Sequence, residues 1–188
     1  LLLSDRLDHP AELPAELERQ GWLTVLSETV MVTGRAAVVP HLDRIMRIEA
    51  VRATAFDTHV ELERRVFGIG ADQAERRRHA IGAAIEAGTL RAWVIWLCAE
   101  PVAVARLSQG EGVAGLQGIG VVPEHRGQGY GTLITTIATR TGMATGNRLV
   151  WLSVSEANEP ALAAYDALGF ERVFSWTRWL LTEDPRRR

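Results

Sequence analysis

Hydrophobic and polar positions alternate in some stretches of the chain and recur every three to four residues in others, and this change of period predicts the secondary structure. Residues 46–52, Met-Arg-Ile-Glu-Ala-Val-Arg, alternate as in a half-buried strand. Ile81, Ala84 and Ile85 instead form one apolar stripe of a helix. We expect helices over residues 11–20, 54–67, 72–87, 131–142 and 158–168. We expect strands over 22–32, 46–52, 92–98, 102–107, 115–122 and 149–154, and one strand or two over 172–181.

The order of these elements predicts the fold class. From residue 46 onward it is β-α-α-β-β-β-α-β-α-β, with short connections between the elements. Such an order is typical of an α/β fold of the α+β kind, in which a mixed sheet of about six to seven strands has helices on both faces. We interpret residues 1–41 as an N-terminal extension, 42–182 as the domain, and 183–188 as a flexible tail.

The extension contains a faint echo of the end of the domain. Residues 17–25 and 165–173 both read as a helix that ends at a glycine and an aromatic residue and is followed by a strand. Two interpretations stay open. The extension is the tail of a preceding, related copy, or the likeness is chance, since this combination of elements is common.

Composition narrows the class of protein. The chain has 188 residues, of which 47% are hydrophobic and 23% are charged, and its net charge is -2. These values indicate a soluble globular protein with no general attraction for nucleic acid or for an anionic membrane. Cys98 is the only cysteine, so no disulfide within the chain is expected, and a reducing, cytoplasmic location is favoured. No apolar run approaches the length of a membrane span, and no signal peptide is expected.

Candidate chemistry is concentrated in one glycine-rich segment. Residues 121–132 read V-V-P-E-H-R-G-Q-G-Y-G-T and join a predicted strand to a predicted helix. The free backbone N–H groups and the positive dipole at a helix N-terminus form a natural anion site. Gly127, Gly129 and Gly131 carry no side chain that would keep phosphate oxygens from these amides.

Other phosphate-binding loops fit this segment less well. A P-loop needs lysine, and all 21 basic residues of the chain are arginine. The dinucleotide pattern G-x-G-x-x-G fails, because its last glycine would fall on Thr132. A glycine-rich turn without a ligand is the remaining alternative.

The residues around the loop resemble the signature of the GNAT superfamily of N-acetyltransferases. The match runs without a gap through Ile119-Gly120-Val121-Val122-Pro123-x-x-Arg126-Gly127-x-Gly129-x-Gly131, and the predicted element order from residue 46 to about 181 also resembles that fold. The resemblance implies that main-chain groups of the strand at Ile119, Gly120 and Val121 pair with the pantetheine arm of acetyl-CoA. It implies that the loop holds the pyrophosphate, chiefly through backbone amides, with Arg126 adding a charge. The residues of the loop in this role are Arg126, Gly127, Gln128, Gly129, Tyr130, Gly131 and Thr132.

A second group of residues lies on the helix predicted near the C-terminus. Asn158 and Tyr165 are seven residues apart, nearly two helical turns, and so share one face. With Gly169 and Phe170 they resemble the Asn…Tyr…Leu-Gly-Phe pattern of the same superfamily. The resemblance implies that Asn158 contacts coenzyme A and that Tyr165 protonates the leaving thiolate. The alternative is that Asn158 only caps the helix and Tyr165 only packs in the core.

No general base can be assigned from the sequence. Ser153 stands where some relatives carry glutamate, and Gly115, Gln117 and Gly118 occupy the strand on which others carry an acid or histidine. Acids that water would have to connect to the site are Glu49, Glu61 and Glu63. The histidines have no metal-ligand spacing, so no metal is expected.

We therefore hypothesise an acetyl-CoA-dependent N-acetyltransferase that acts on a primary amine of a small molecule or peptide. The alternatives are a non-catalytic acyl-CoA-binding or regulatory domain and a structural module of a tandem protein. Neither nucleic acid nor membrane is an expected partner, and a homodimer stays open.

Overall fold

The computed structural model describes residues 1–5, 9–41, 45–52 and 56–181. The predicted helix start at Thr54 and the predicted tail at 183–188 lie outside this part of the chain. The described residues form eight strands and five α-helices, with parallel and antiparallel strand pairs. The predicted mixed α+β class is thus confirmed. The sheet has more strands than the six to seven expected for the domain. The three-residue β1 (Leu2–Ser4) is too short to show a period, and the strand predicted in the N-terminal extension lay outside the domain for which the number was given.

The chain divides into two compact units. Residues 1–32 and the residues from 153 onward form the first unit, and residues 33–152 form the second. These bounds differ from those of the predicted extension and domain. Whether residues 1–41 descend from a preceding copy stays a hypothesis.

The second unit is built around a sheet with the strand order β7-β6-β5-β4-β3. The bounds of its strands are β3 (Met46–Ala50), β4 (Leu90–Leu97), β5 (Glu100–Gln109), β6 (Val113–Val121) and β7 (Leu149–Ser155). Neighbours from β3 to β6 are antiparallel, whereas β6 pairs with β7 in parallel over Leu149–Leu152. The last residues of β7, from Ser153 onward, belong to the first unit.

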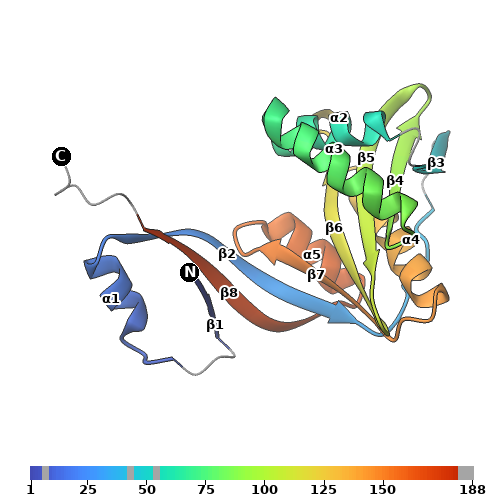
Figure 1. The fold of residues 1–188 in the computed structure, drawn as a ribbon. Helices are drawn as coiled ribbons and strands as arrows, with labels where there is room; N and C mark the ends of the chain where they lie inside the picture. The colour runs from blue at the N-terminus through green and yellow to red at the C-terminus, as the bar shows by residue number, and fades with distance from the viewer. Residues whose placement is uncertain (6–8, 42–44, 53–55, 182–188) are drawn as a thin grey trace. The chain divides into compact units, whose positions relative to one another are not determined.

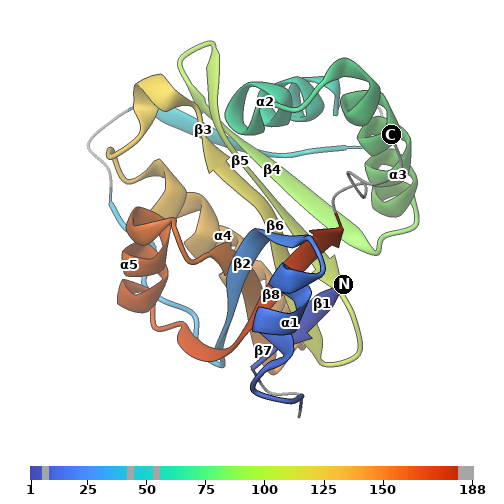
Figure 2. The same ribbon diagram turned by 90° about the vertical axis from the view of Figure 1, so that its left-hand side faces the viewer.

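Helices cover both faces of this sheet, as the element order predicts. The helices α2 (Asp57–Phe67) and α3 (Ala71–Glu86) lie on one face and α4 (Tyr130–Ala144) on the other (Figure 1; Figure 2). The core lies between these layers. Ile95 and Val104 from the strands, Ile134 from α4 and Val60 from α2 are almost completely buried. Each such side chain stabilises the fold by about 1.5–3 kcal/mol relative to exposure.

The first unit is a three-stranded ribbon with the order β1-β8-β2. Antiparallel pairing joins β2 (Trp22–Thr33) to β8 (Glu171–Leu181) over most of its length, and β1 pairs with the other edge of β8. The C-terminal segment is therefore one strand and not two. The unit also contains α1 (Leu13–Arg19) and α5 (Glu159–Ala167). Leu17 and Trp179 are buried in this unit.

No helix within the described residues combines the length and the apolar character needed to cross a bilayer.

Candidate functional site

A bulge interrupts β6 just before the glycine-rich loop. The register pairs Gln117 with Arg106 and Gly120 with Val104, so two residues of β6 face the single residue Ala105 of β5. The first of the two, Gly118, has a left-handed backbone with φ +57. A glycine in this conformation is the usual first residue of one class of β-bulge, and bulges occur often beside active sites.

The bulge is followed by backbone groups that point away from β5. The Val122 N–H donates to the Val102 carbonyl, so Val122 and Val102 form a hydrogen-bonded pair of the antiparallel ladder. Because the two kinds of pair alternate, the next pair, Val121 and Ala103, is a non-hydrogen-bonded one. The backbone N–H and C=O of Val121 therefore point to the opposite edge, and those of Ile119 do the same by alternation. Parallel pairing on that edge ends with Leu116 and Leu152.

The glycine-rich loop presents the uncapped N-terminus of α4. Gly127 and Gly129 have φ +71 and +85, which carries the chain through a tight turn into the helix. The N-cap residue Gly129 provides no side-chain hydrogen bond, and the first turn contains no acidic residue. A Cβ at Gly127 would meet no atom within 4 Å. Amides at a helix N-terminus with open space around the preceding turn are suited to an anion such as pyrophosphate.

The side chains of the predicted loop residues have different surroundings. Arg126 is exposed, and its Nε donates to the Val121 carbonyl over 3.2 Å. Gln128 Nε2 donates to the Glu124 carbonyl over 3.3 Å. Tyr130 is fully buried, and its ring stands edge-on to that of His125, so its side chain takes no part in ligand contact. The remaining predicted residues, Gly131 and Thr132, lie in the first turn of α4.

A buried charge cluster lies on the other side of the bulge. Glu63 of α2 is fully buried, and its Oε1 is 2.9 Å from Arg106 Nε of β5 and 3.3 Å from His59 Nε2. Its Oε2 is 3.3 Å from Arg77 NH1 of α3. A Cβ at Gly118 would lie 2.8 Å from Glu63 Oε1 and from the Arg106 guanidinium. The space that a side chain at Gly118 of β6 would occupy is thus filled by side chains of α2 and β5.

The environment of Glu63 keeps its carboxylate ionised. Burial raises the pKa of Glu63, but the neighbouring His59, Arg106 and Arg77 together outweigh this effect and lower it below the ordinary 4.5. An ionised, completely buried carboxylate between two guanidinium groups is a weak proton acceptor. Sequence reasoning named Glu63 only as a distant acid. Its spacing of four residues from His59 on one helix face is the only local signal of the cluster.

The helix α5 in the first unit carries the other two predicted residues. Asn158 is its N-cap, and Asn158 Oδ1 accepts a hydrogen bond from the Ala161 N–H over 3.3 Å. Tyr165 is buried, its ring centroid lies 5.9 Å from that of Phe170, and burial raises the pKa of its hydroxyl to about 12. Asn158 therefore caps α5, and Tyr165 packs in the core, as the two alternatives to ligand contact stated. Neither excludes a ligand contact, and the position of α5 relative to the loop stays a prediction.

A carboxylate stands next to Ser153, where the sequence lacks one. Ser153 Oγ donates to Glu28 Oε2 of β2 over 2.8 Å. Nearby in the same unit, Glu156 Oε1 accepts from Ser175 Oγ over 2.6 Å and from Thr29 Oγ1 over 3.2 Å. Sequence reasoning missed Glu28 because 125 residues separate it from Ser153.

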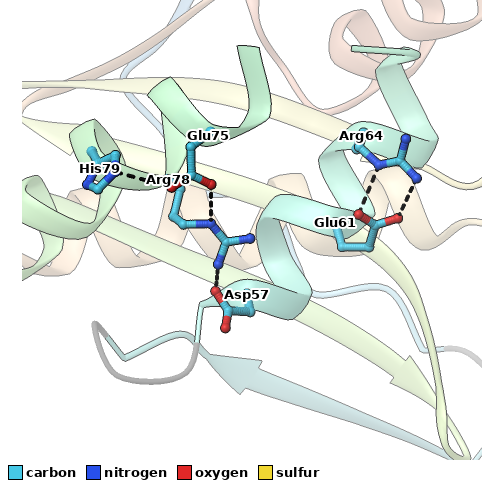
Figure 3. Close-up of polar contacts among 6 residues, drawn as sticks. All are labelled: Asp57, Glu61, Arg64, Glu75, Arg78 and His79. Carbon is cyan, nitrogen blue, oxygen red and sulfur yellow. Dashed lines mark hydrogen bonds and ion pairs between the residues drawn. The ribbon is translucent and has the colours of Figure 1, made fainter. Parts of the chain in front are cut away.

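The other two acids named from the sequence pair with nearby arginines on the surface. Glu49 Oε2 lies 2.9 Å from Arg47 NH1. Glu61 accepts two hydrogen bonds from Arg64 on the exposed side of α2 (Figure 3). Neither belongs to the cluster at the bulge.

Comparison with known sequences decides the family. The sequence model of the acetyltransferase (GNAT) family matches residues 54–170, which contain the loop, the bulge and α5. The chain belongs to the GNAT acetyltransferase family. Membership implies an acyltransferase. No curated protein matches the chain in sequence.

Solved structures of GNAT proteins share the fold. A GCN5-related N-acetyltransferase from Kribbella flavida has a TM-score of 0.71 at 21% identity, and the match covers 97% of this chain and 68% of that one. The corresponding protein from Sphaerobacter thermophilus has a TM-score of 0.74 at 16% identity, over 94% of this chain and 57% of that one. A predicted acetyltransferase from Clostridium acetobutylicum, solved with acetyl-CoA, has a TM-score of 0.59 at 14% identity, over 69% of this chain and 92% of that one.

Among the described residues, no group of three or more His, Cys, Asp or Glu side chains is arranged to hold a metal ion.

The charge cluster leads to a prediction about acid stability. Because the pKa of Glu63 is lowered in the folded state, its ionised form contributes to stability above pH 4.5, and this contribution is lost as the pH falls through the lowered value. Glu63→Gln should be less stable than the wild type by about 3–5 kcal/mol at neutral pH. The difference should shrink between pH 5 and pH 3, as measured by urea unfolding.

The exposed Glu111→Gln substitution in the turn between β5 and β6 serves as the control and should change the curve little. A stability difference for Glu63→Gln that stays constant down to pH 3 would contradict the ionised state.

Proposed function

We propose that this chain is an acetyl-CoA-dependent N-acetyltransferase that moves the acetyl group directly from the thioester to a primary amine of a small molecule or peptide. The proposal rests on three features that follow one another between Gly118 and Tyr130. They are the bulge in β6, the backbone groups that point away from β5, and the N-terminus of α4 without a side-chain cap. These features supply backbone partners for an extended arm and, next to them, amides for a pyrophosphate. Family membership and the acetyl-CoA in the Clostridium acetobutylicum relative support it.

The residues present fit acetyl-CoA by their chemistry. Ile119 and Val121 would pair with the pantetheine arm through main-chain N–H and C=O groups, with Gly120 between them. The amides from Gly127 to Thr132 would hold the pyrophosphate, and the amide group of Asn158 would add a contact. Acetyl-CoA supplies the activated acetyl group. The protein binds it, orients it, and manages two protons.

The first proton belongs to the leaving group. When the amine nitrogen attacks the thioester carbon, a carbon–nitrogen bond forms, the carbon–sulfur bond breaks, and the sulfur takes up a proton. Tyr165 is the donor in this proposal. With its pKa near 12, its hydroxyl is protonated at every pH at which the enzyme would work.

The second proton is lost by the attacking amine. We assign its uptake to Glu28, because the Glu28 carboxylate accepts a hydrogen bond from Ser153, which stands where some relatives carry a glutamate. Glu63 is less suited, because it is fully buried and its pKa is lowered.

Binding is tested first by titrating acetyl-CoA into the protein by calorimetry, followed by a screen of amines for release of free thiol.

The matched variants are Gly129→Asp and Gly129→Asn, since both side chains tolerate a left-handed backbone and can cap α4. Gly129→Asp should weaken acetyl-CoA binding at least about tenfold, because it adds a negative charge where the pyrophosphate would lie, and Gly129→Asn should weaken it less. Equal affinities for the two variants would contradict the placement of the pyrophosphate. Binding without turnover on any amine would favour a regulatory domain.

The role of Tyr165 predicts a loss of turnover without a loss of fold. Tyr165→Phe should lower kcat about 100-fold and leave the KM for acetyl-CoA nearly unchanged, since the ring still packs against Phe170. The wild-type rate should not fall between pH 8 and pH 10 through ionisation of Tyr165, because its pKa lies near 12. Full transfer by Tyr165→Phe would rule out the acid role.

The role of Glu28 predicts a deficit that depends on pH. Glu28→Gln keeps a hydrogen-bond acceptor for Ser153 but cannot take up a proton, so kcat should fall most at neutral pH. The deficit should shrink as the pH approaches the pKa of an alkyl amine acceptor, near 10, since the amine then loses its proton in solution. Glu156→Gln in the same unit is the control. A deficit that is the same at pH 7 and pH 10 would show that Glu28 acts otherwise.

A further inference from the structure

The first unit contains one arrangement of helix, turn and strand twice. The helix α1 leads into β2 and α5 leads into β8, with a left-handed glycine between helix and strand in each case. Gly21 and Gly169 have φ +85 and +81, and each donates its N–H over 3.0 Å to the carbonyl three residues earlier. The offset in residue number between these two glycines also relates Leu17 to Tyr165, which are buried in α1 and α5. Because many helices end at such a glycine, this likeness alone would not relate the two segments.

The two strands also carry bulges at equivalent positions. The antiparallel register between β2 and β8 passes over Val25 in β2 and over Val173 in β8. The offset that relates the two glycines also relates these two valines. Glu28 and Trp176 are paired and are counterparts by the same offset, so a pseudo-twofold axis that exchanges β2 and β8 passes through this pair. Related proteins keep their bulges at fixed positions, so two bulges at equivalent positions indicate two related strands.

The strands on either side of this pair correspond as well, since the order is β1-β8-β2-β7. Beside β8, the Asp5 N–H that follows β1 donates to the Ser175 carbonyl over 3.1 Å. Beside β2, the Glu156 N–H that follows β7 donates to the Ser27 carbonyl over 3.0 Å. Ser27 and Ser175 are again counterparts by the same offset. The strand β1 is therefore placed relative to α1 and β2 as β7 is placed relative to α5 and β8.

The elements β7, α5 and β8, to which the N-terminal segment corresponds, are the last three of this chain's GNAT fold. The Clostridium acetobutylicum acetyltransferase is matched over 92% of its length by 69% of this chain, so a nearly whole fold of this kind takes up only part of the chain. The match to the Kribbella flavida structure covers 97% of this chain, N-terminal segment included, but only 68% of that protein, which therefore has further chain beside it.

The end of the ribbon at which β8 finishes exposes a leucine whose counterpart is buried. Thr33, the last residue of β2, is 4% exposed, whereas its counterpart Leu181, the last residue of β8, is 51% exposed. Leu23 near the start of β2 is 56% exposed, but its counterpart is Glu171, which is exposed too. Symmetry thus indicates that Leu181 lies on a surface that a second fold of the same kind would cover, and that Leu23 does not.

We propose that this end of the ribbon binds a second GNAT domain of the same polypeptide, and that β1, α1 and β2 are the last three elements of that domain. The inference rests on the symmetry of the ribbon and does not require acetyl transfer. It has a consequence for the proposed chemistry, because Glu28 lies on β2. The proton acceptor assigned above would then be contributed by the strand of the second domain.

The test compares the intact gene product with the chain of residues 1–188, each with and without Leu181→Glu. In the intact protein the substitution should lower the Tm by at least about 5 °C, because it places an unpaired charge under the second domain. In residues 1–188 the same side chain is exposed, so the Tm should change by less than about 2 °C. Leu23→Glu is the matched control, since it introduces the residue that stands at the counterpart position, and it should change neither protein.

Hydrogen exchange measured by mass spectrometry gives a second readout that needs no variant. Peptides that contain β1 and the end of β8 should exchange more slowly in the intact protein than in residues 1–188. Equal exchange in the two proteins, or an equal effect of Leu181→Glu in both, would overturn the inference. An intact gene product without a GNAT-like sequence ahead of residue 1 would also overturn it. None of these outcomes bears on acyl transfer, which the Gly129 variants and the amine screen test separately.

Discussion

The close approach of α2 to β6 is the constraint on which the rest of the second unit depends. A Cβ at Gly120 would lie only 2.2 Å from Val66 Cγ1, and one at Gly118 would lie 2.8 Å from Glu63 and Arg106. The helix can rest on the strand only because these two positions carry no side chain. The same closeness brings the buried charge cluster to the bulge.

Burial of charge makes this contact rigid. A completely buried carboxylate costs several kcal/mol of desolvation unless cations lie beside it, and removing one partner of a buried ion pair costs about 3–5 kcal/mol. Glu63 therefore holds Arg106 and Arg77 in place, and α2, α3 and β5 with them. The lowered pKa of Glu63 is the consequence: the cluster is stable with the carboxylate ionised, which suits positioning better than proton transfer.

The proposed chemistry divides between main chain and side chains. The loop offers backbone amides and a helix dipole, whose partial charges do not change with pH. Proton transfer is assigned to Tyr165 and Glu28, whose neighbours in the first unit are very different. Tyr165 is buried against Phe170, which raises its pKa to about 12, whereas Glu28 is held by the hydroxyl of Ser153.

Local patterns in the sequence determined the elements, the mixed α+β class, and the loop that enters α4. They succeeded because periodicity, helix caps and glycines in left-handed turns depend on residues a few positions apart. The charge cluster at Gly118 could not be derived in this way. Its side chains come from α2, α3 and β5, and they fit against β6 only because Gly118 has no side chain. The carboxylate at Ser153 is also a tertiary feature, since it arrives from β2 across 125 residues. Sequence spacing leaves such contacts open, because the order of strands in a sheet and the packing of helices on it decide which distant side chains meet.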